Sequence, residues 1–112
     1  QWRTIIFMRF VETTVFTRQV IGLLADDEYR ALQAPLILRP EQGAVIRGSG
    51  GLRKVRWGAR GAGKRGGIRV IYYWFLPGET FLMLFAYPKN VQDDLTPEQL
   101  KLLRQFVEKE FP

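Results

Sequence analysis

The stretch IRVIYYWFLPGETFLMLFAY, residues 68–87, decides the fold because it reads as two β-strands joined by a tight turn. β-Branched and aromatic residues, which favour strands, dominate positions 68–76, and aromatic and other apolar residues fill positions 81–87. Pro77 and Gly78 between them are typical of a turn. Strands with so short a connection usually pair antiparallel. We therefore expect an antiparallel sheet built around this hairpin.

Before this hairpin, the sequence predicts one more sheet strand and an N-terminal strand followed by a helix. Residues 52–57 alternate imperfectly and read as the strand that precedes the hairpin. Residues 4–12 are apolar and partly β-branched, which indicates a buried strand. Thr13 or Thr14 can cap the helix that follows. Its apolar face is expected to carry Val15, Phe16, Gln19, Val20, Leu23 and Leu24.

A second helix is expected directly after the first, so that the two form a helical hairpin. Asp26 or Asp27 can cap its N-terminus. Pro35 lies within it, and proline removes one hydrogen bond and clashes with the preceding turn. We therefore expect a kink or an early stop at Pro35. The face of this helix is expected to carry Tyr29, Leu32, Leu36 and Ile37.

The chain is expected to end in a helix over residues 96–111. Thr96 is suited to the N-cap, Pro97 to the first helical position, and Gln99 completes a capping box. The apolar stripe of this helix is expected to comprise Leu100, Leu103, Phe106 and Val107. The predicted order β-α-α-β-β-β-α corresponds to an α+β fold in one domain, residues 1–112.

Composition excludes several classes of chemistry. The chain has 112 residues without cysteine or histidine, so thiol nucleophiles, disulfides and the histidine pair of many ribonucleases are impossible. The absence of cysteine leans towards a reducing cytoplasm, and no apolar run approaches the length of a membrane span. Met8 could be a start site, which would make residues 1–7 an extension.

The net charge of +6 is concentrated in one segment. No acidic residue lies between Glu41 and Glu79, whereas the remainder of the chain has more acids than bases. A cluster of like charges repels itself and is therefore usually present for an anionic partner, although it can also be a solvated face. The basic residues of this segment are Arg47, Arg53, Lys54, Arg56, Arg60, Lys64, Arg65 and Arg69.

The glycines at positions 58–67 resemble two nucleotide-binding motifs without completing either. Gly58 with Gly63 and Lys64 matches part of a P-loop, and residues 61–66 match a dinucleotide fingerprint. Both motifs require a helix after the loop to hold the phosphate. The residues that follow predict a strand, and Arg65 stands where a P-loop needs serine or threonine. The sequence therefore disfavours nucleotide binding.

The basic segment suits cleavage of RNA by its own 2′-hydroxyl. No carboxylate lies in the segment, which disfavours a two-metal phosphodiesterase site. Arginine can hold a phosphate oxygen, and lysine among cations can approach general-base behaviour. A tyrosine among cations is expected to be more acidic by the same reasoning. Because the nucleophile comes with the RNA, the protein needs only to orient and stabilise the phosphate and move protons.

The chain resembles the RelE/ParE superfamily of bacterial type II toxins, and within it the HigB-type branch. The resemblance runs from about residue 10 to the end and keeps the spacing and order of its motifs. The fold it implies, an N-terminal strand and helical hairpin followed by an antiparallel sheet and a C-terminal helix, agrees with the patterns above. The motifs are FVETTVF (10–16), DDEYRALQ (26–33), GSGGLRKVR (48–56), GKRGGIRVIYY (63–73) and YPK (87–89).

The resemblance implies a ribosome-dependent mRNA endonuclease in the cytoplasm that uses neither metal nor cofactor. Its implied partners are the ribosome, mRNA and a cognate antitoxin, expected to be a helix-turn-helix protein of the HigA type. Two functions remain as alternatives: a ParE-like toxin that poisons gyrase, and a non-catalytic basic module that binds nucleic acid. ParE-like relatives tend to lack the combination of a basic sheet and a Tyr-x-Lys end, so the sequence favours the endonuclease.

The family's functional residues carry over to named positions. Arg69 matches the sheet arginine placed against the scissile phosphate, and Tyr87 with Lys89 matches the catalytic Tyr-x-Lys pair. Tyr87 could instead be a strand-end tyrosine with a structural hydrogen bond. Pro88, between the pair, departs from the family pattern, as does Pro35 in the second helix. Arg56 and Lys64 match further basic positions of the site, and the expected ribosome or mRNA contacts are Arg53, Lys54, Arg60 and Arg65.

Aromatic residues around the basic segment have two interpretations. Tyr72, Tyr73 and Trp74 fit the core and the sheet surface better than base-stacking platforms. Trp57 could stack on a base or pack beneath the glycine-rich loop, and the sequence does not decide between them.

Overall fold

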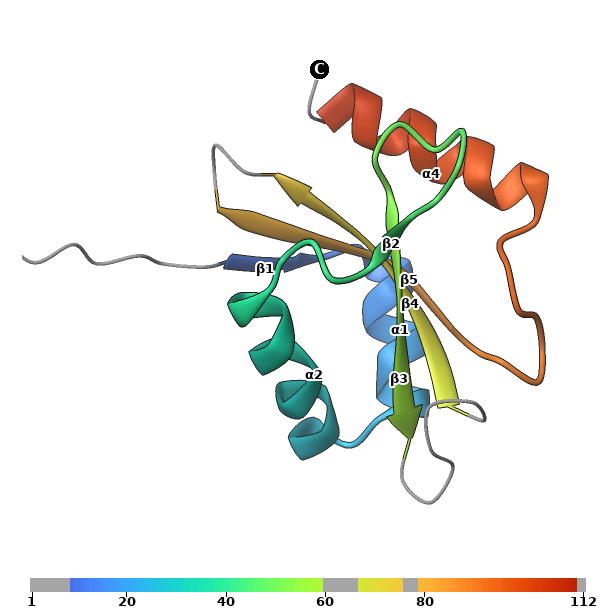
Figure 1. The fold of residues 1–112 in the computed structure, drawn as a ribbon. Helices are drawn as coiled ribbons and strands as arrows, with labels where there is room; N and C mark the ends of the chain where they lie inside the picture. The colour runs from blue at the N-terminus through green and yellow to red at the C-terminus, as the bar shows by residue number, and fades with distance from the viewer. Residues whose placement is uncertain (1–8, 60–66, 76–78, 111–112) are drawn as a thin grey trace, which may run out of the picture.

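The computed structural model describes residues 9–59, 67–75 and 79–110 and shows an α+β fold (Figure 1). The predicted element order is confirmed, with one short strand added between the second helix and the sheet. The elements are β1 (Arg9–Glu12), α1 (Thr14–Leu23), α2 (Asp26–Leu38), β2 (Ala44–Val45), β3 (Arg53–Ala59), β4 (Gly67–Phe75), β5 (Thr80–Pro88) and α4 (Pro97–Glu110).

The sheet has five strands in the order β1-β5-β4-β3-β2. The hairpin predicted from residues 68–87 is confirmed: β4 pairs antiparallel with β5, from Phe75 opposite Thr80 to Ile68 opposite Pro88. β3 pairs antiparallel with β4 on the other side. β1 lies parallel to β5, which makes the sheet mixed. The predicted antiparallel part is thus the centre of the sheet, and the N-terminal strand extends one edge.

Helices α1 and α2 cover one face of the sheet (Figure 1). Phe16 and Val20 of α1 and Leu32 and Leu36 of α2 are buried against the apolar residues of the central strands. A buried side chain of this size contributes about 1.5–3 kcal/mol through the hydrophobic effect. The strand residues in this cluster are Val55, Ile68, Val70, Tyr72, Phe81, Met83 and Ala86.

Helix α4 covers the opposite face, which we call the α4 face (Figure 1). Val107 is buried there, and Leu100 and Leu103 are partly buried against the same cluster. Phe106 is 39% exposed, so it lies at the edge of the predicted stripe. The sheet contributes Leu52, Ile71, Leu82, Leu84 and Tyr87 to this second core.

The N-termini of α1 and α4 begin where their capping residues predict. The Thr13 hydroxyl accepts a hydrogen bond from Phe16 N at 3.0 Å, which makes Thr13 the cap of α1. At α4, Thr96 Oγ1 accepts from Gln99 N at 3.1 Å, and Gln99 Oε1 accepts from Thr96 N at 2.9 Å. This reciprocal pair satisfies two backbone donors that a helix start leaves open.

The cap of α2 differs from the prediction. Ala25 is the N-cap residue, so the assignment of Asp26 or Asp27 is wrong. The Ala25 backbone N–H is instead satisfied by the Glu28 carboxylate at 2.9 Å. Asp26 and Asp27 lie in the first turn, where the helix dipole favours negative charge. The helix therefore begins at Asp26, so that both aspartates lie inside the helix and neither caps it.

Helix α2 continues past Pro35 to Leu38, so the predicted early stop is wrong. Proline near the end of a helix removes one backbone donor but leaves its own carbonyl available. The Pro35 carbonyl accepts a hydrogen bond from Arg39 N at 2.9 Å, and Leu36 in the last turn is fully buried. Packing of Leu36 thus stabilises the turn that follows Pro35. Ile37, expected on the same face, is 43% exposed.

Tyr72 is a core residue, as predicted. Its ring is fully buried, and its hydroxyl donates to the Pro40 carbonyl at 2.7 Å and accepts from Gly43 N at 3.0 Å. Gly43 approaches so closely that a Cβ there would lie 2.8 Å from the Tyr72 ring. Trp57 and Trp74 are partly buried against the same core and partly exposed, so base stacking by Trp57 stays a prediction.

Candidate nucleic-acid interface

Three of the predicted site residues meet in one row across the sheet. Arg56 of β3 lies directly opposite Arg69 of β4, and Arg69 lies directly opposite Tyr87 of β5. Directly opposed residues share a face, with their Cβ atoms about 4.5–5.5 Å apart. Arg56 and Arg69, on either side of the glycine-rich segment, thus become neighbours, as do Arg69 and Tyr87 on the two strands of the hairpin. We call Arg56, Arg69 and Tyr87 the cross-strand row.

The cross-strand row lies on the α4 face. Side chains alternate between the faces of a strand, and Val55 belongs to the core beneath α1 and α2. Lys54 and Arg56 therefore point to the α4 face, where Tyr87 packs in the second core. Lys54 extends the row on β3, its side chain is 17% exposed, and its Nζ lies 2.5 Å from Asp94 Oδ1.

Arg69 is the most deeply buried charged residue described, with 2% of its surface exposed. Burial of an unpaired charge costs several kcal/mol, so its guanidinium needs partners. Nη2 donates to Asp93 Oδ1 at 3.4 Å, and Nη1 donates to the Ile68 carbonyl at 3.4 Å. Both contacts are long for charge-assisted hydrogen bonds. Arg69 is thus neutralised by a loop carboxylate at the border between core and site.

The pKa of Tyr87 is raised, contrary to the expectation that neighbouring cations make tyrosine more acidic. Burial, the largest cause, and the charge of Asp94 raise the pKa of Tyr87 to about 12, and Arg69 lowers it only in part. The side chain is 4% exposed, and its hydroxyl donates to the Asp93 carbonyl at 3.2 Å. Desolvation outweighs the nearby cation because the phenolate would lose its hydration.

Asp93 and Asp94 are the residues of the site that the sequence analysis missed. They follow β5 in the connection to α4, outside the segment that lacks acids. Asp94 carries a lowered pKa because it accepts a hydrogen bond from Lys54 and feels the charges of Lys54, Arg56 and Arg69. The available signal is two adjacent acids shortly after the Tyr-x-Lys end. Local charge counting ignores them because it does not bring distant segments together.

Lys89 lies outside the cross-strand row. Lys89 follows β5, its side chain is exposed, and its backbone N donates to the Gly67 carbonyl at 3.0 Å. The ladder between β4 and β5 thus fixes the main chain of Lys89 and leaves its ammonium group in solvent. Arg60, Lys64 and Arg65 lie outside the described residues, in the connection between β3 and β4.

Arg53 points away from the row, although it precedes Lys54 on the same strand. It pairs with Tyr72 and lies on the face covered by α1 and α2. Its Nη1 donates to the carbonyls of Glu41 and Gly43, each at 2.8 Å. These bonds hold the connection between α2 and β2 against the sheet. In this structure the Arg53 guanidinium therefore has a structural role. Its contact with RNA stays a prediction.

The glycine-rich segment is followed by a strand, as predicted. β4 begins at Gly67, so no helix N-terminus stands directly after the segment to receive a phosphate. The structural context that a P-loop or a dinucleotide fingerprint requires is therefore missing at this position.

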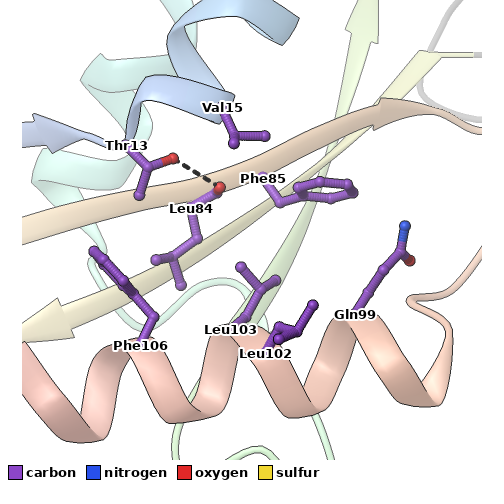
Figure 2. Close-up of a pocket in the computed structure, with 8 residues that line it drawn as sticks. All are labelled: Thr13, Val15, Leu84, Phe85, Gln99, Leu102, Leu103 and Phe106. Atoms are coloured by element: carbon purple, nitrogen blue, oxygen red, sulfur yellow. Dashed lines mark hydrogen bonds between the residues drawn. The ribbon is translucent and has the colours of Figure 1, made fainter.

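An apolar cavity of about 290 Å³ lies between α1, β5 and α4, apart from the charged row. Figure 2 shows Leu84 and Phe85 of β5 facing the side chains of α4, while the Thr13 hydroxyl donates to the Leu84 carbonyl at 3.0 Å. No charged residue lines this cavity, so it offers nothing to a phosphate. Its lining comprises Thr13, Val15, Leu84, Phe85, Gln99, Leu102, Leu103 and Phe106.

No protein-family model matches the chain. In the described ranges, no group of acidic side chains is arranged to hold a metal ion. None of the helices in those ranges has the length and apolar character needed to cross a membrane.

Proposed function

We propose that this protein is the toxin of a bacterial type II toxin–antitoxin system and acts as a ribosome-dependent mRNA endonuclease. The observation that carries the proposal is the cross-strand row, in which two arginines and a tyrosine lie side by side across three strands. Lys54 adds a further cation on the same face. This combination of anion-binding groups and a neutral phenol fits an anionic substrate such as a phosphodiester better than an uncharged one.

In the proposed reaction, the RNA 2′-hydroxyl loses its proton to water and attacks the adjacent phosphorus, and the displaced 5′-oxygen takes up a proton. Arg69 and Arg56 stabilise the negative charge that grows on the phosphate oxygens. Tyr87 keeps its proton at neutral pH, and burial, the largest cause, raises its pKa to about 12. It therefore acts as a hydrogen-bond or proton donor towards the phosphate or the leaving oxygen, and not as a base. The products carry a 2′,3′-cyclic phosphate and a 5′-hydroxyl.

The proposed setting is the bacterial cytoplasm, with the ribosome, mRNA and a HigA-type antitoxin as partners. Basic residues around the row would contact the RNA backbone or the ribosome, which supplies the rest of the substrate's geometry. No metal or cofactor enters the proposed chemistry, because the nucleophile belongs to the RNA and the charge is stabilised by arginine.

A second candidate is a non-catalytic RNA-binding module. The burial of Arg69 and the structural hydrogen bond of Tyr87 to the Asp93 carbonyl favour this alternative. The gyrase-poisoning function has no described feature in its favour. The two remaining candidates differ in one property, since only the endonuclease shortens mRNA.

The test is cleavage of mRNA on pre-formed stalled ribosomes, with ribosome binding measured separately. Arg69→Ala should lower the single-turnover rate at saturating ribosome by roughly 10²–10³, the scale for loss of one preorganised donor. Lys54→Ala should weaken binding and leave the saturated rate near that of the parent. Arg18→Ala, at an exposed position of α1 on the other face, is the matched control.

Four further outcomes test the proposed function and its mechanism. Expression of the chain alone should stop bacterial growth, and co-expression of its antitoxin should restore it. Cleavage should persist when free divalent ions are chelated after the ribosome complex has formed. Binding without cleavage would favour the non-catalytic module, and a 5′-phosphate on the product would reject attack by the 2′-hydroxyl.

A further inference from the structure

Two cations of the α4 face, Arg69 of the cross-strand row and Lys54 beside it, are already paired with carboxylates of the protein itself. Arg69 is 2% exposed and donates to Asp93, and Lys54 is bound to Asp94. Both carboxylates come from the connection between β5 and α4, residues 89–96. In this arrangement, Asp93 occupies a hydrogen-bonding position on the Arg69 guanidinium that an RNA phosphate would otherwise take. We call Asp93 and Asp94 the acidic pair.

The acidic pair lies at the surface and is held mainly by polar contacts. The side chains of Asp93 and Asp94 are 56% and 77% exposed. The backbone around them is held by Tyr87, whose hydroxyl donates to the Asp93 carbonyl, and by Gln92, whose side chain donates to the Asp94 carbonyl at 3.1 Å. Val91 before them is 71% exposed, whereas Leu95 after them packs partly buried against the second core, so apolar contact anchors the segment mainly at its α4 end. The part around Val91 and Asp93, with fewer buried contacts, opens at lower cost than the core.

We propose that the acidic pair occupies the positions of two substrate phosphates and that RNA binds by displacing it. This inference rests on the proposed function, because it takes the row as the phosphate site. The chemistry supports the exchange, since carboxylate and phosphate oxygens accept the same hydrogen bonds from arginine and lysine. Displacement leaves both carboxylates in solvent, where they are already more than half exposed.

The exchange makes the site selective for polyanions. A single small anion that replaces one carboxylate exchanges one ion pair for another and gains little. A nucleic-acid strand brings several phosphates at once and releases its condensed counterions when they meet protein cations. Asp93 and Asp94 thus determine specificity, because they weaken the binding of free phosphate more than the binding of RNA.

The test measures equilibrium binding of a short 2′-O-methyl oligoribonucleotide, which lacks the attacking hydroxyl and stays intact. Removal of each carboxylate in Asp93→Asn and Asp94→Asn should strengthen binding about two- to fivefold, the range expected for loss of one exposed ion pair. In the double variant, the dependence of affinity on salt should steepen by up to about one charge for each acid removed. Inorganic phosphate should compete with the RNA at lower concentration than in the parent.

Glu108→Gln is the matched control, because Glu108 is exposed and pairs with Arg104 on α4 instead of with the row. A second pair of substitutions, Asp93→Ser with Asp94→Ser, removes the same charges with a different side chain, so that one poorly folded variant does not decide the result. Thermal denaturation establishes which variants are folded.

Unchanged or weaker RNA binding in folded Asn and Ser variants would overturn the inference. An equal gain in Glu108→Gln would also overturn it, because the effect would then follow from net charge alone. The binding assay contains neither ribosomes nor cleavable RNA. A protein that binds more tightly after loss of the acidic pair but cleaves nothing on ribosomes would therefore contradict the proposed endonuclease and leave the inference standing.

Discussion

Replacing Tyr87 by phenylalanine should change how the stability of the protein depends on alkaline pH. The phenol is buried on the α4 face, and its pKa is raised from 10.0 to about 12. Below pH 10 both the folded and the unfolded chain keep this proton, so Tyr87 gives stability no pH dependence there. Above pH 10 the unfolded chain releases the proton while the folded chain retains it. Stability is therefore lost as pH rises from 10 towards 12.

The size of this loss follows from the pKa. A rise from 10.0 to about 12 corresponds to at most about 2.7 kcal/mol. Part of the rise comes from Asp94, which is exposed and screened by solvent, so we expect about 1–2 kcal/mol. Tyr87→Phe also loses the hydrogen bond to the Asp93 carbonyl, which costs about 0.5–1.5 kcal/mol below pH 10. The parent's advantage over the variant should thus shrink or reverse above pH 10.

The assay is urea unfolding of the parent and Tyr87→Phe at a series of pH values on both sides of pH 10. Burial also raises the pKa of Tyr29 and Tyr72, but both proteins share these residues, so the difference between the curves isolates Tyr87. Absorbance of the phenolate in the folded proteins provides an independent titration. A difference in stability that stays constant across pH 10 would refute the burial argument and leave Tyr87 free to ionise.

Three other substitutions test the packing that supports the site, each by urea unfolding at neutral pH. Leu36→Ala empties a fully buried position and should cost about 2–5 kcal/mol; a loss below 1 kcal/mol would show that Pro35 loosens this turn. Gly43→Ala places a Cβ 2.8 Å from the Tyr72 ring and should cost about 1–3 kcal/mol, whereas a neutral result would contradict the close approach. Thr96→Ala removes the cap of α4 and should cost about 1 kcal/mol, unless Gln99 alone suffices.

Local chemistry made much of the fold predictable from sequence. The Thr96 and Gln99 capping box acts between residues three positions apart, so its signal lies entirely within a short stretch. The strands on either side of Pro77 and Gly78 follow from β-branched and aromatic composition in the same way. Features of this kind depend on a few neighbouring residues and little on how the remainder of the chain folds.

Features that depend on distant segments were not predictable in this way. Glu12 lies beside Met83 because β1 joins the edge of β5, and nothing in residues 9–12 specifies a parallel partner. The pairing of Asp93 with Arg69 requires the connection after β5 to return to the sheet. Burial raises the pKa of Tyr87, although neighbouring cations were expected to lower it. A sequence shows which charges are near a residue more readily than whether the residue is shielded from water.

Arg53 shows the same limit within a single strand. Its charge suggested an RNA contact, yet alternation along β3 directs it away from Lys54 and Arg56 and towards the carbonyls of Glu41 and Gly43. Which face of the sheet a residue occupies depends on register, and register is set by pairing with β4.

The parallel pairing of β1 with β5 also sets the order in which the molecule can assemble during translation. Roughly 70 residues separate Glu12 from Thr80, and a ribosome needs about 4–14 s to synthesise them at 5–20 residues per second. Until β5 emerges, β1 lacks its partner strand, and Gln19 of α1 lacks the Ala86 backbone N–H to which it bonds. Tyr87 arrives with that same last strand. A nascent chain therefore contains Arg56 and Arg69 well before it can complete the row across the sheet, and the site is among the last parts of the protein to form.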